Sequence, residues 1–348
     1  MIVMDSKPHD MDESAMVAAA TAGDEAAFTT LTRRYRRELH VHCYRMLASF
    51  EDAEDLVQET FLRAWQKRET FQGRATFRAW LYRIATNACL DFLARHERRV
   101  IEIAARGSAS AEAAVAPHVA WLQPFPDRLL ERPAPGDGEP DAMLARKETI
   151  ELAFLVAMQC LPPKQRAVLI LRDVLDWSAS ETAALLESSV ASVNGALQRA
   201  RAALRRRQPA RGTHHSPGDS SSEQERLLVQ QYVDATVRCD AEGLVRLLRE
   251  DARFSMPPEP VAYVGSEVLV RAWVEGGFGS PPYNDWKYVV TAANRLPAVV
   301  WYLRRPGEEG HHAFAIDVLR IENGAIAEIT AFGVTHLLDA FGLPATLS

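Results

Sequence analysis

The stretch from Leu161 to Arg207 constrains the fold of this chain most, because its prolines and helix-capping residues divide it into successive helices joined by short turns. The pair Pro162-Pro163 is tolerated only at a helix start, and apolar residues then recur at helical spacing. Ser178 with Glu181 three residues later is a capping box, which begins a second helix. The pattern predicts two short helices separated by a turn.

A third helix follows, with Ser189 as the expected N-cap. Its predicted apolar stripe consists of Val190, Val193, Leu197, Ala200 and Leu204. The segment from Val190 to Arg211 holds six arginines and no acidic residue. That composition suits phosphate contacts, so we interpret the three helices as a helix-turn-helix for duplex DNA. The alternative is an ordinary three-helix core with a solvated basic face.

An acidic ridge stands in the first part of the chain. Glu51, Asp55 and Glu59 are four residues apart on one helix line, although like charges at that spacing repel. The opposite side of the helix is apolar, so the ridge is predicted to be exposed and available to a basic partner protein. The alternative is an acidic surface that only aids solubility.

The next helix is basic and aromatic. Its predicted inward side consists of Phe77, Trp80, Leu81, Ile84, Ala88 and Phe92. Arginines interleaved with aromatic rings suit an unstacked single strand, because cations follow the backbone and rings stack on bases. Buried aromatics at this spacing are more often packing, and we expect at least Phe77 and Trp80 to be core.

Two motifs make the chain resemble a known family. The run Asp52–Trp65, followed by Phe71–Asn87 and Asp91, is similar to region 2 of bacterial sigma-70 factors. The run Leu161–Leu169 is similar to the opening of their region 4. The order and separation of the motifs resemble the extracytoplasmic function (ECF) group. The resemblance implies two all-α domains, a region 2 helical bundle and a region 4 helix-turn-helix.

The resemblance also implies three binding surfaces. Docking on core RNA polymerase is assigned to Asp52, Asp55, Leu56, Gln58 and Glu59. Melting and recognition of the minus-10 element are assigned to Arg74, Arg78, Arg83, Asn87 and Asp91. Recognition of the minus-35 element in the major groove is assigned to Ser189, Ser192, Asn194, Gln198, Arg199, Arg201 and Arg205. The chain departs from the commonest pattern at Asn194, where a basic residue often stands, and Gly195 inside a helix suggests close approach to another backbone or to DNA.

Charge and cysteine content fit a cytoplasmic regulator. The 348 residues have a net charge of −6, but residues 217–348 hold 11 basic and 18 acidic side chains, so the acidity is C-terminal. The four cysteines have no close pair in sequence, which argues against a disulfide frame or a zinc site. No run is long enough to span a bilayer, and neither a cofactor nor a metal is expected.

Two linkers divide the chain into predicted segments: region 2 over 1–98, a linker over 99–141, region 4 over 142–208, a tether over 209–222 and a further domain over 223–348. The first residues, Met1 to Met11, are polar and expected to be disordered. In sigma factors the first linker runs through the polymerase, and Trp121 and Phe125 could anchor it there. The alternative is that they clip the linker onto the chain's own C-terminal domain.

The segment from Glu223 onward is predicted to be α+β. Two helices precede period-two strands at Trp286–Ala293, Ala298–Leu303, His312–Leu319 and Ala325–Phe332. Asn323-Gly324 predicts a hairpin turn. The pattern resembles the SnoaL-like cone that some ECF factors carry. The candidate ligand pocket consists of Tyr263, Trp273, Trp301, His312 and Phe314.

The expected function is a transcription initiation factor without catalytic activity, regulated in cis by the cone. Its expected partners are core RNA polymerase and promoter DNA, with an anti-sigma protein or a small hydrophobic ligand as further candidates and no membrane. One alternative is an isomerase- or cyclase-like cone using Asp285, His312, Asp317 or Glu328. A third interpretation is a repressor that uses only the helix-turn-helix.

Overall fold

The computed structural model describes residues 13–73, 75–96, 98–104, 106, 115–130, 150–207, 219–333 and 337–348. The predicted disordered start, the Pro-rich end of the first linker and most of the tether therefore lie outside the described residues. The chain packs into two compact units. Unit 1 joins Met1–Arg98 with Pro162–Ala202, and unit 2 joins Arg99–Leu161 with Ala203–Ser348.

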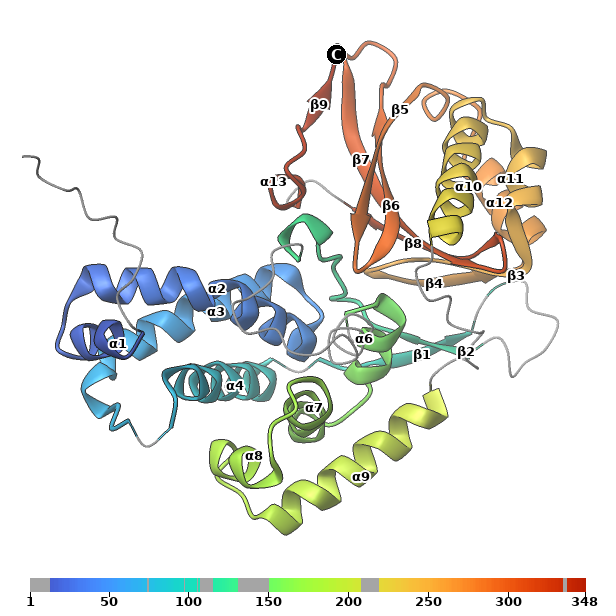
Figure 1. Ribbon diagram of the computed structural model, residues 1–348. Coiled ribbons are helices and arrows are strands. Elements are labelled where there is room, and N and C mark those ends of the chain that lie inside the picture. Colours follow the sequence, from blue (N-terminus) through green and yellow to red (C-terminus); the bar gives the residue numbers. More distant parts are fainter. Residues whose placement is uncertain are drawn as a thin grey trace, which may run out of the picture. The chain divides into compact units, whose positions relative to one another are not determined.

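Unit 1 begins with the helices α1 (Glu13–Thr21), α2 (Glu25–Leu47), α3 (Phe50–Gln66) and α4 (Phe77–Arg95), with the short 3₁₀ helix η1 (Arg68–Thr70) before α4. Each long helix starts at a side-chain cap. Asp24, Ser49 and Thr76 accept backbone N–H groups at the first turns of α2, α3 and α4. Helices α2, α3 and α4 pack against one another around a buried apolar core (Figure 1).

The second part of unit 1 consists of α7 (Pro163–Leu169), a π-helical turn η3 (Ile170–Val174), α8 (Ala179–Leu185) and α9 (Val190–Arg207). The capping box is present at α8, since the Ser178 side chain accepts from the Glu181 N–H and the Glu181 carboxylate accepts from the Ser178 N–H. At α9 the Ser189 hydroxyl accepts the Ser192 N–H at 3.1 Å. The predicted helices and caps are therefore present. Helix α7 packs against α2 and α4.

Two cysteines that are distant in sequence meet in the core of unit 1. Cys43 of α2 and Cys89 of α4 are both free and fully buried, and they contact each other. Burial and the neighbouring Cys43 raise the pKa of the Cys89 thiol. Sequence spacing could not show this pair, because helix packing brings the two residues together.

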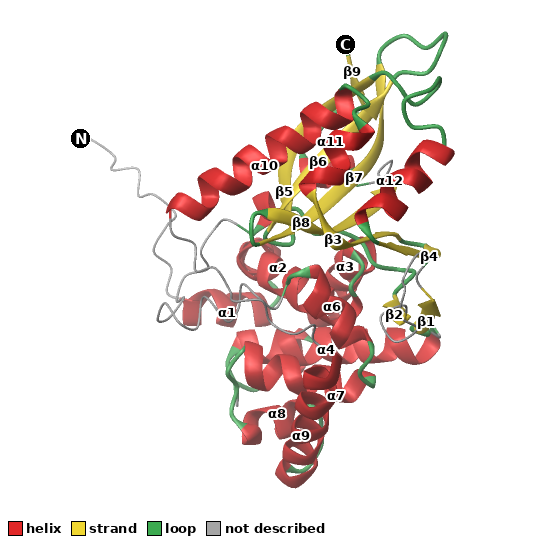
Figure 2. Cartoon of the chain, turned by 90° about the vertical axis from the view of Figure 1, so that its right-hand side faces the viewer, coloured by secondary structure: helices red, strands yellow, loops and turns green. Residues whose placement is uncertain are grey.

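Unit 2 contains a seven-stranded sheet. Its strands are β3 (Leu248–Met256), β4 (Glu259–Val264), β5 (Trp286–Ala293), β6 (Leu296–Leu303), β7 (His311–Glu322), β8 (Ala325–Gly333) and β9 (Thr346–Leu347). The strand order is β4-β3-β8-β7-β6-β5, with β9 paired to β7. The helices α10 (Asp219–Val237), α11 (Ala241–Leu247) and α12 (Ser266–Glu275) lie on one face of this sheet, and α13 (Leu338–Phe341) follows β8 (Figures 1 and 2).

The sheet agrees with most of the sequence prediction. The four predicted strands correspond to β5 to β8, and Asn323 and Gly324 have the positive φ angles of 53° and 77° expected for their turn. Three features differ. Strands β3, β4 and β9 were not predicted, nor was a third helix, α12, and β3 pairs in parallel with β8, so the sheet is mixed.

The first linker is structured where it is described. It forms an antiparallel pair of β1 (Ile101–Ala104) and β2 (Val115–His118) and a 3₁₀ turn η2 (Asp127–Leu129), and the helix α6 (Leu152–Gln159) follows within the segment that was predicted as region 4. Arg106 pairs with the outer edge of β4. Its backbone N–H donates to the Ala262 carbonyl, and its carbonyl accepts the Val264 N–H. The linker and α6 therefore belong to the packing of unit 2. Within the described part of the chain, no helix combines the length and apolar character needed to cross a membrane.

Candidate nucleic-acid and protein interfaces

Helix α3 presents the predicted polymerase-docking residues on two sides. Asp55 and Gln58 are exposed, and Asp52 and Glu59 are partly exposed. Leu56 is only 8% exposed and packs into the core of unit 1, so its side chain is not part of the exposed surface. We define the α3 acidic face as Asp52, Asp55, Gln58 and Glu59.

Two members of the α3 acidic face are held by neighbouring arginines. Arg98 forms an ion pair with Asp52, and Arg63 donates to Glu59 at 2.7 Å. The hydrogen bond with Glu59 raises the pKa of Arg63 against the opposing effect of its burial. These pairs fix the orientation of two carboxylates, whereas the Asp55 side chain projects from the exposed side of the helix.

The predicted minus-10 residues on α4 divide into two groups. Arg83, Asn87 and Asp91 follow one line of the helix at steps of four. Arg78 is on another side, where its Nε donates to Glu38 at 2.8 Å and its guanidinium lies 4.9 Å from the Tyr82 ring. Arg78 thus holds α4 against α2.

The aromatic residues at the start of α4 form a cluster. Phe77 is buried and Trp80 is half-buried, and their ring centroids are 5.5 Å apart. Phe71 contacts both rings. The expectation that Phe77 is core is confirmed, while Trp80 keeps part of its surface exposed. Arg74, also assigned to the minus-10 surface, lies outside the described residues.

Helix α9 and its cap expose the whole predicted minus-35 set. The exposed members are Ser189, Ser192, Asn194, Gln198, Arg199, Arg201 and Arg205. Two of them already have structural roles. Ser189 caps the helix, and Arg201 forms a bidentate pair with Asp173 of η3, with N–O distances of 2.8 and 2.6 Å. Of the predicted polar set, the side chains left for DNA contacts in the first three turns are Ser192, Asn194, Gln198 and Arg199.

One residue of the predicted apolar stripe is not buried. Val190, the first residue of α9, is 44% exposed, whereas Val193 and Leu197 pack inward as predicted. The first residue of the helix lies beyond the side chains that would cover it. The helical spacing of apolar residues therefore predicts one more buried residue than the structure has. The prediction for Val190 was wrong, and an apolar side chain stands on the exposed first turn.

Gly195 has open space beside it. A Cβ atom at this position would meet only the Arg199 guanidinium, at 3.4 Å, among the described residues. Arginine side chains can move aside, so packing within the chain does not require glycine here. The sequence suggested two reasons for a glycine at this position. The described residues give no support to close approach of another backbone of this chain, so close approach to DNA stays the expected reason.

In unit 2, the hairpin between β5 and β6 holds the linker. Asn294, at its tip, is fully buried and has a positive φ of 56°. Its Oδ1 accepts the Phe125 N–H at 2.8 Å, and its Nδ2 donates to the Ile150 carbonyl at 2.7 Å. The Asn294 N–H in turn donates to the Phe125 carbonyl at 2.9 Å. One asparagine therefore ties both the linker and the residues just before α6 to the sheet.

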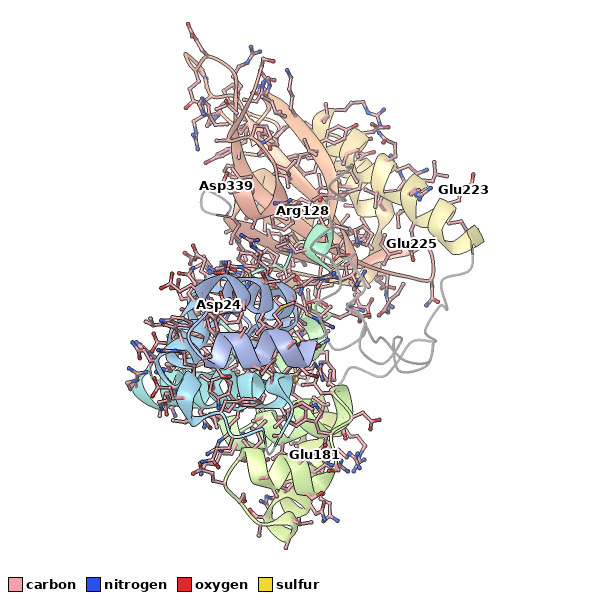
Figure 3. All side chains as sticks on the ribbon, turned by 60° about the vertical axis from the view of Figure 1, so that its left-hand side comes forward. Asp24, Arg128, Glu181, Glu223, Glu225 and Asp339 are labelled. Carbon is pink, nitrogen blue, oxygen red and sulfur yellow. The ribbon has the colours of Figure 1, made fainter. Side chains whose placement is uncertain are left out.

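Further contacts extend this attachment. The Arg295 N–H donates to Asp127 Oδ1 at 2.9 Å. Arg128 donates to the carbonyl oxygens of Asp339 and Ala340 at 2.7 and 2.6 Å, and Figure 3 labels Arg128 and Asp339. Phe125 is only 1% exposed. We call residues 122–130, with these contacts, the linker clip.

The helix-covered face of the sheet contains a buried carboxylate. Both the Tyr232 hydroxyl and the Trp301 Nε1–H donate to Asp317 Oδ2, at 2.8 and 2.6 Å. Burial raises the pKa of Asp317 to about 6, against the opposing effect of these two hydrogen bonds. Tyr232 and Trp301 belong to a hydrophobic core against which further, partly buried aromatic side chains pack, and we call this set the aromatic cluster: Phe254, Tyr263, Trp273, Phe278, Trp286 and Tyr288.

The predicted pocket residues are only partly brought together. Tyr263, Trp273 and Trp301 belong to this aromatic cluster. Phe314 is 40% exposed and contacts Tyr283 and Trp286, while His312 is exposed. A β-bulge explains the difference. Trp301 pairs with Ala315 and the next residue, Tyr302, pairs with Ala313, so regular alternation along β7 is interrupted.

The other candidate catalytic groups are engaged elsewhere. Asp285 binds Arg304 and His311, and the hydrogen bonds from His311 and Arg304 lower its pKa. Glu328 accepts from Arg320 at 2.9 Å. Of the four groups proposed from the sequence, only Asp317 lies in the aromatic cluster.

Sequence reasoning missed several residues that the structure makes prominent. Asn294, Asp127 and Arg128 build the linker clip, and Arg166 of α7 donates to the Met46 carbonyl at the end of α2. Only the linker clip was indicated in the sequence, by the aromatic residues Trp121 and Phe125 in an otherwise polar linker. The partners of each residue are more than 100 positions away, so no local pattern marks them.

Comparison with known proteins agrees with this architecture. Residues 31–99 match the Sigma-70 region 2 family, residues 151–204 match Sigma-70 region 4, and residues 229–329 match the SnoaL-like domain family. The chain is 39% identical over 342 residues to the ECF RNA polymerase sigma factor SigG of Mycobacterium tuberculosis, covering 95% of this chain and 89% of that protein. The chain belongs to the ECF sigma factors of the sigma-70 family and carries a C-terminal SnoaL-like domain.

Other relatives match less of the chain. SigM of M. tuberculosis is 31% identical over 198 residues, which covers 57% of this chain and 85% of SigM. Among solved structures, that of the extracytoplasmic function sigma factor SigJ of M. tuberculosis aligns with a TM-score of 0.56 and 21% identity, covering 91% of this chain and 99% of SigJ. At that identity the likeness supports the fold alone.

Proposed function

We propose that this ECF sigma factor binds core RNA polymerase through the α3 acidic face and contacts promoter DNA through α4 and α9. The observation that carries the assignment is the separation of charge between helices of unit 1. Helix α3 presents exposed carboxylates, whereas the exposed side of α9 presents arginines and amides without an acid. Carboxylates suit a basic protein surface, and the α9 side chains suit phosphates and base edges.

We further propose that the SnoaL-like domain regulates the sigma regions in cis by holding the linker. The linker clip supports this, because Phe125 is buried and both its N–H and its carbonyl are bound by Asn294. The family resemblance implies that this linker runs through the polymerase, and so away from the SnoaL-like domain. Residues 122–130 cannot occupy both places, so the domain and the polymerase compete for them.

Abortive transcription with core RNA polymerase on genomic DNA fragments tests both proposals. The full chain is compared with a chain ending at Arg211 and with the full-length variant Asn294→Asp, which loses the donor to Ile150. Promoter-specific products from any form support the initiation factor. Higher initiation by the variant indicates that the linker clip inhibits, and lower initiation indicates that it activates.

Two outcomes count against these proposals. Equal rates for the full chain and Asn294→Asp would contradict control through the linker clip, provided that hydrogen exchange shows a freed linker. DNA binding without initiation by any form would support the repressor interpretation instead. Asn323→Asp is the matched control, since Asn323 also has a positive φ but is exposed in the β7–β8 turn.

A second candidate role for the SnoaL-like domain is sensing a small hydrophobic molecule. The specific observation is Asp317, a buried carboxylate bound by Tyr232 and Trp301, which both belong to the aromatic-rich core of the domain. A ligand with one polar group could replace one of these hydrogen bonds while stacking on the rings. A hydrophobic compound library screened by thermal shift on the wild type and Asp317→Asn tests this, and a hit that shifts both equally would contradict it.

A further inference from the structure

One oxygen of the Asp317 carboxylate has no partner in the protein. The hydrogen bonds from Tyr232 and Trp301 both reach Oδ2, at 2.8 and 2.6 Å, and Oδ1 accepts none from the described residues. Asp317 also keeps 7% of its surface exposed, more than Tyr232 at 2% or Trp301 at 3%. The two donors therefore fix the orientation of the carboxylate and leave Oδ1 for a further hydrogen-bond donor.

No positive charge of the chain compensates this carboxylate. Within the described part of the chain, no Lys, Arg or His forms an ion pair with Asp317, and both of its partners are neutral donors. Burial raises the pKa of Asp317 to about 6, so the carboxylate is ionised at neutral pH. A buried anion without a cation is costly, and a ligand that carries a positive charge removes this cost.

Aromatic rings lead from the surface of the domain toward Asp317. Phe314 is 40% exposed, and its ring centroid lies 5.4 Å from that of Trp286. The centroid of Trp286 lies 6.1 Å from that of Trp301, which donates to Asp317. Tyr288 is partly buried and also lies 6.1 Å from Trp301. Ring faces attract both organic cations and apolar groups, so these side chains suit the two ends of an amine.

We propose that the SnoaL-like domain binds a hydrophobic amine in its ammonium form, with an N–H group donating to Asp317 Oδ1 and the apolar part packed against Trp286 and Tyr288. This inference rests on the proposed sensing role of the domain and names the ligand class of that site. A neutral alcohol can donate a hydrogen bond but leaves the charge of Asp317 unpaired, and an anionic ligand is repelled. The site therefore discriminates by charge among ligands of one shape.

Three compounds of similar size and different charge test the proposal: 2-phenylethylammonium, 2-phenylethanol and phenylacetate. Each is titrated into the full chain at neutral pH, and binding is followed by calorimetry and by tryptophan fluorescence. We expect the ammonium to bind about tenfold more tightly than the alcohol, because an ion pair is strong in a desolvated site. Phenylacetate should bind more weakly than either.

Asp317→Asn removes the charge and keeps the size of the side chain. Its affinity for the ammonium should fall about tenfold, while its affinity for the alcohol should be unchanged. Glu242→Gln is the matched control, because Glu242 is an exposed carboxylate of the same domain. Trp286→Leu is a second variant for the case in which Asp317→Asn fails to fold by circular dichroism. It should weaken the ammonium more than the alcohol, since the ring face attracts a cation.

Four results would overturn the ammonium assignment. The first is equal affinity of the wild type for the ammonium and the alcohol, and the second is tighter binding of phenylacetate than of the ammonium. The third is wild-type affinity for the ammonium in a folded Asp317→Asn or Trp286→Leu variant, and the fourth is no binding of any of the three compounds.

Failure of the sensing role is recognised separately, by abortive transcription with each compound at a saturating concentration. If the ammonium binds through Asp317 and initiation does not change, the ligand class holds and sensing is contradicted. If the alcohol binds as tightly as the ammonium and changes initiation, sensing holds and the ligand class is contradicted.

Discussion

Asn294 and Phe125 form a closed pair of hydrogen bonds across 169 positions of sequence. The Phe125 N–H donates to Asn294 Oδ1 at 2.8 Å, and the Asn294 N–H donates to the Phe125 carbonyl at 2.9 Å. The same asparagine donates to Ile150. A buried amide with every polar atom engaged specifies one position of the linker on the sheet.

Replacement of Asn294 by aspartate should destabilise unit 2 by about 2 kcal/mol, because the Ile150 carbonyl loses its donor and then faces a carboxylate. Urea denaturation gives the change in the free energy of unfolding, and hydrogen exchange should accelerate in residues 119–130. The exposed Asn323→Asp change should have little effect on either quantity. Equal destabilisation by the two variants would mean that the linker clip adds nothing beyond the turn conformation.

The buried Asp317 should make unit 2 less stable as the pH rises from about 4 to about 6. Its folded pKa of about 6 lies above the ordinary value of 3.8, so the folded state binds the proton more tightly than the unfolded state. Above pH 6 both states are ionised, and the folded state has lost about 3 kcal/mol relative to acidic pH, at 1.36 kcal/mol per pKa unit.

Asp317→Asn isolates this effect from other titrating groups. The difference in unfolding free energy between the wild type and the variant should change between pH 4 and pH 6 and be constant from pH 6.5 to 8. The variant amide can still accept a hydrogen bond from Tyr232 or Trp301, so it should remain folded. A difference that is flat over the whole range would show that Asp317 keeps an ordinary pKa.

Two arginines of α9 should behave differently toward DNA. Arg199→Ala should weaken minus-35 binding and reduce the salt dependence by about one counterion, because an exposed guanidinium can reach a phosphate. Arg201→Ala should act mainly on the stability of the helix-turn-helix, since Arg201 is bound to Asp173 through two hydrogen bonds. Fluorescence anisotropy at several salt concentrations distinguishes them. An equal loss of salt dependence in both variants would contradict the assignment.

The exposed Val190 should read a thymine methyl group in the minus-35 element, because apolar side chains on the first turn of a recognition helix contact that group. Replacing each thymine by deoxyuridine removes only the methyl. One replacement should weaken binding of the wild type about fivefold and have no effect on Val190→Ala. If every single replacement weakens both proteins alike, Val190 does not contact a thymine.

Charge reversal on the α3 acidic face should weaken polymerase binding. Asp55→Lys places a cation on the exposed side of α3, and we expect the dissociation constant for core RNA polymerase to rise about tenfold at low salt. The difference should shrink as salt increases. Glu69→Lys changes the net charge equally at an exposed site outside this face, so an equal effect of both changes would indicate only general electrostatics.

Much of the local structure was predictable because its causes are local. Ser178 and Glu181 cap α8 across three residues, Asn323 and Gly324 form their turn, and β5 begins and ends where its period-two pattern does. The family motifs are contiguous too. These features depend on neighbours in sequence, so periodicity and spacing sufficed to predict the helices and the α+β segment, and the contiguous motifs sufficed for the resemblance to the sigma regions.

Local periodicity was misleading at the ends and irregularities of elements. Val190 fits the apolar stripe of α9 but starts beyond the core that would cover it, and His312 fits a buried face of β7 that a β-bulge interrupts. A repeat in sequence gives the direction of a side chain only within a regular element. Where an element begins, and whether a strand bulges, depends on its partners.

The sequence by itself determined the long helices of unit 1 and the strands β5 to β8, the family that the motifs resemble and the helices that carry acidic or basic faces. Only the tertiary structure decided that Asn294 binds Phe125, that Arg166 reaches Met46 and that Tyr232 and Trp301 share Asp317. All of these are buried polar contacts between different elements of the chain. A buried polar group has lost its water and must form a hydrogen bond within the protein. Its partner is therefore whichever group the tertiary fold places beside it.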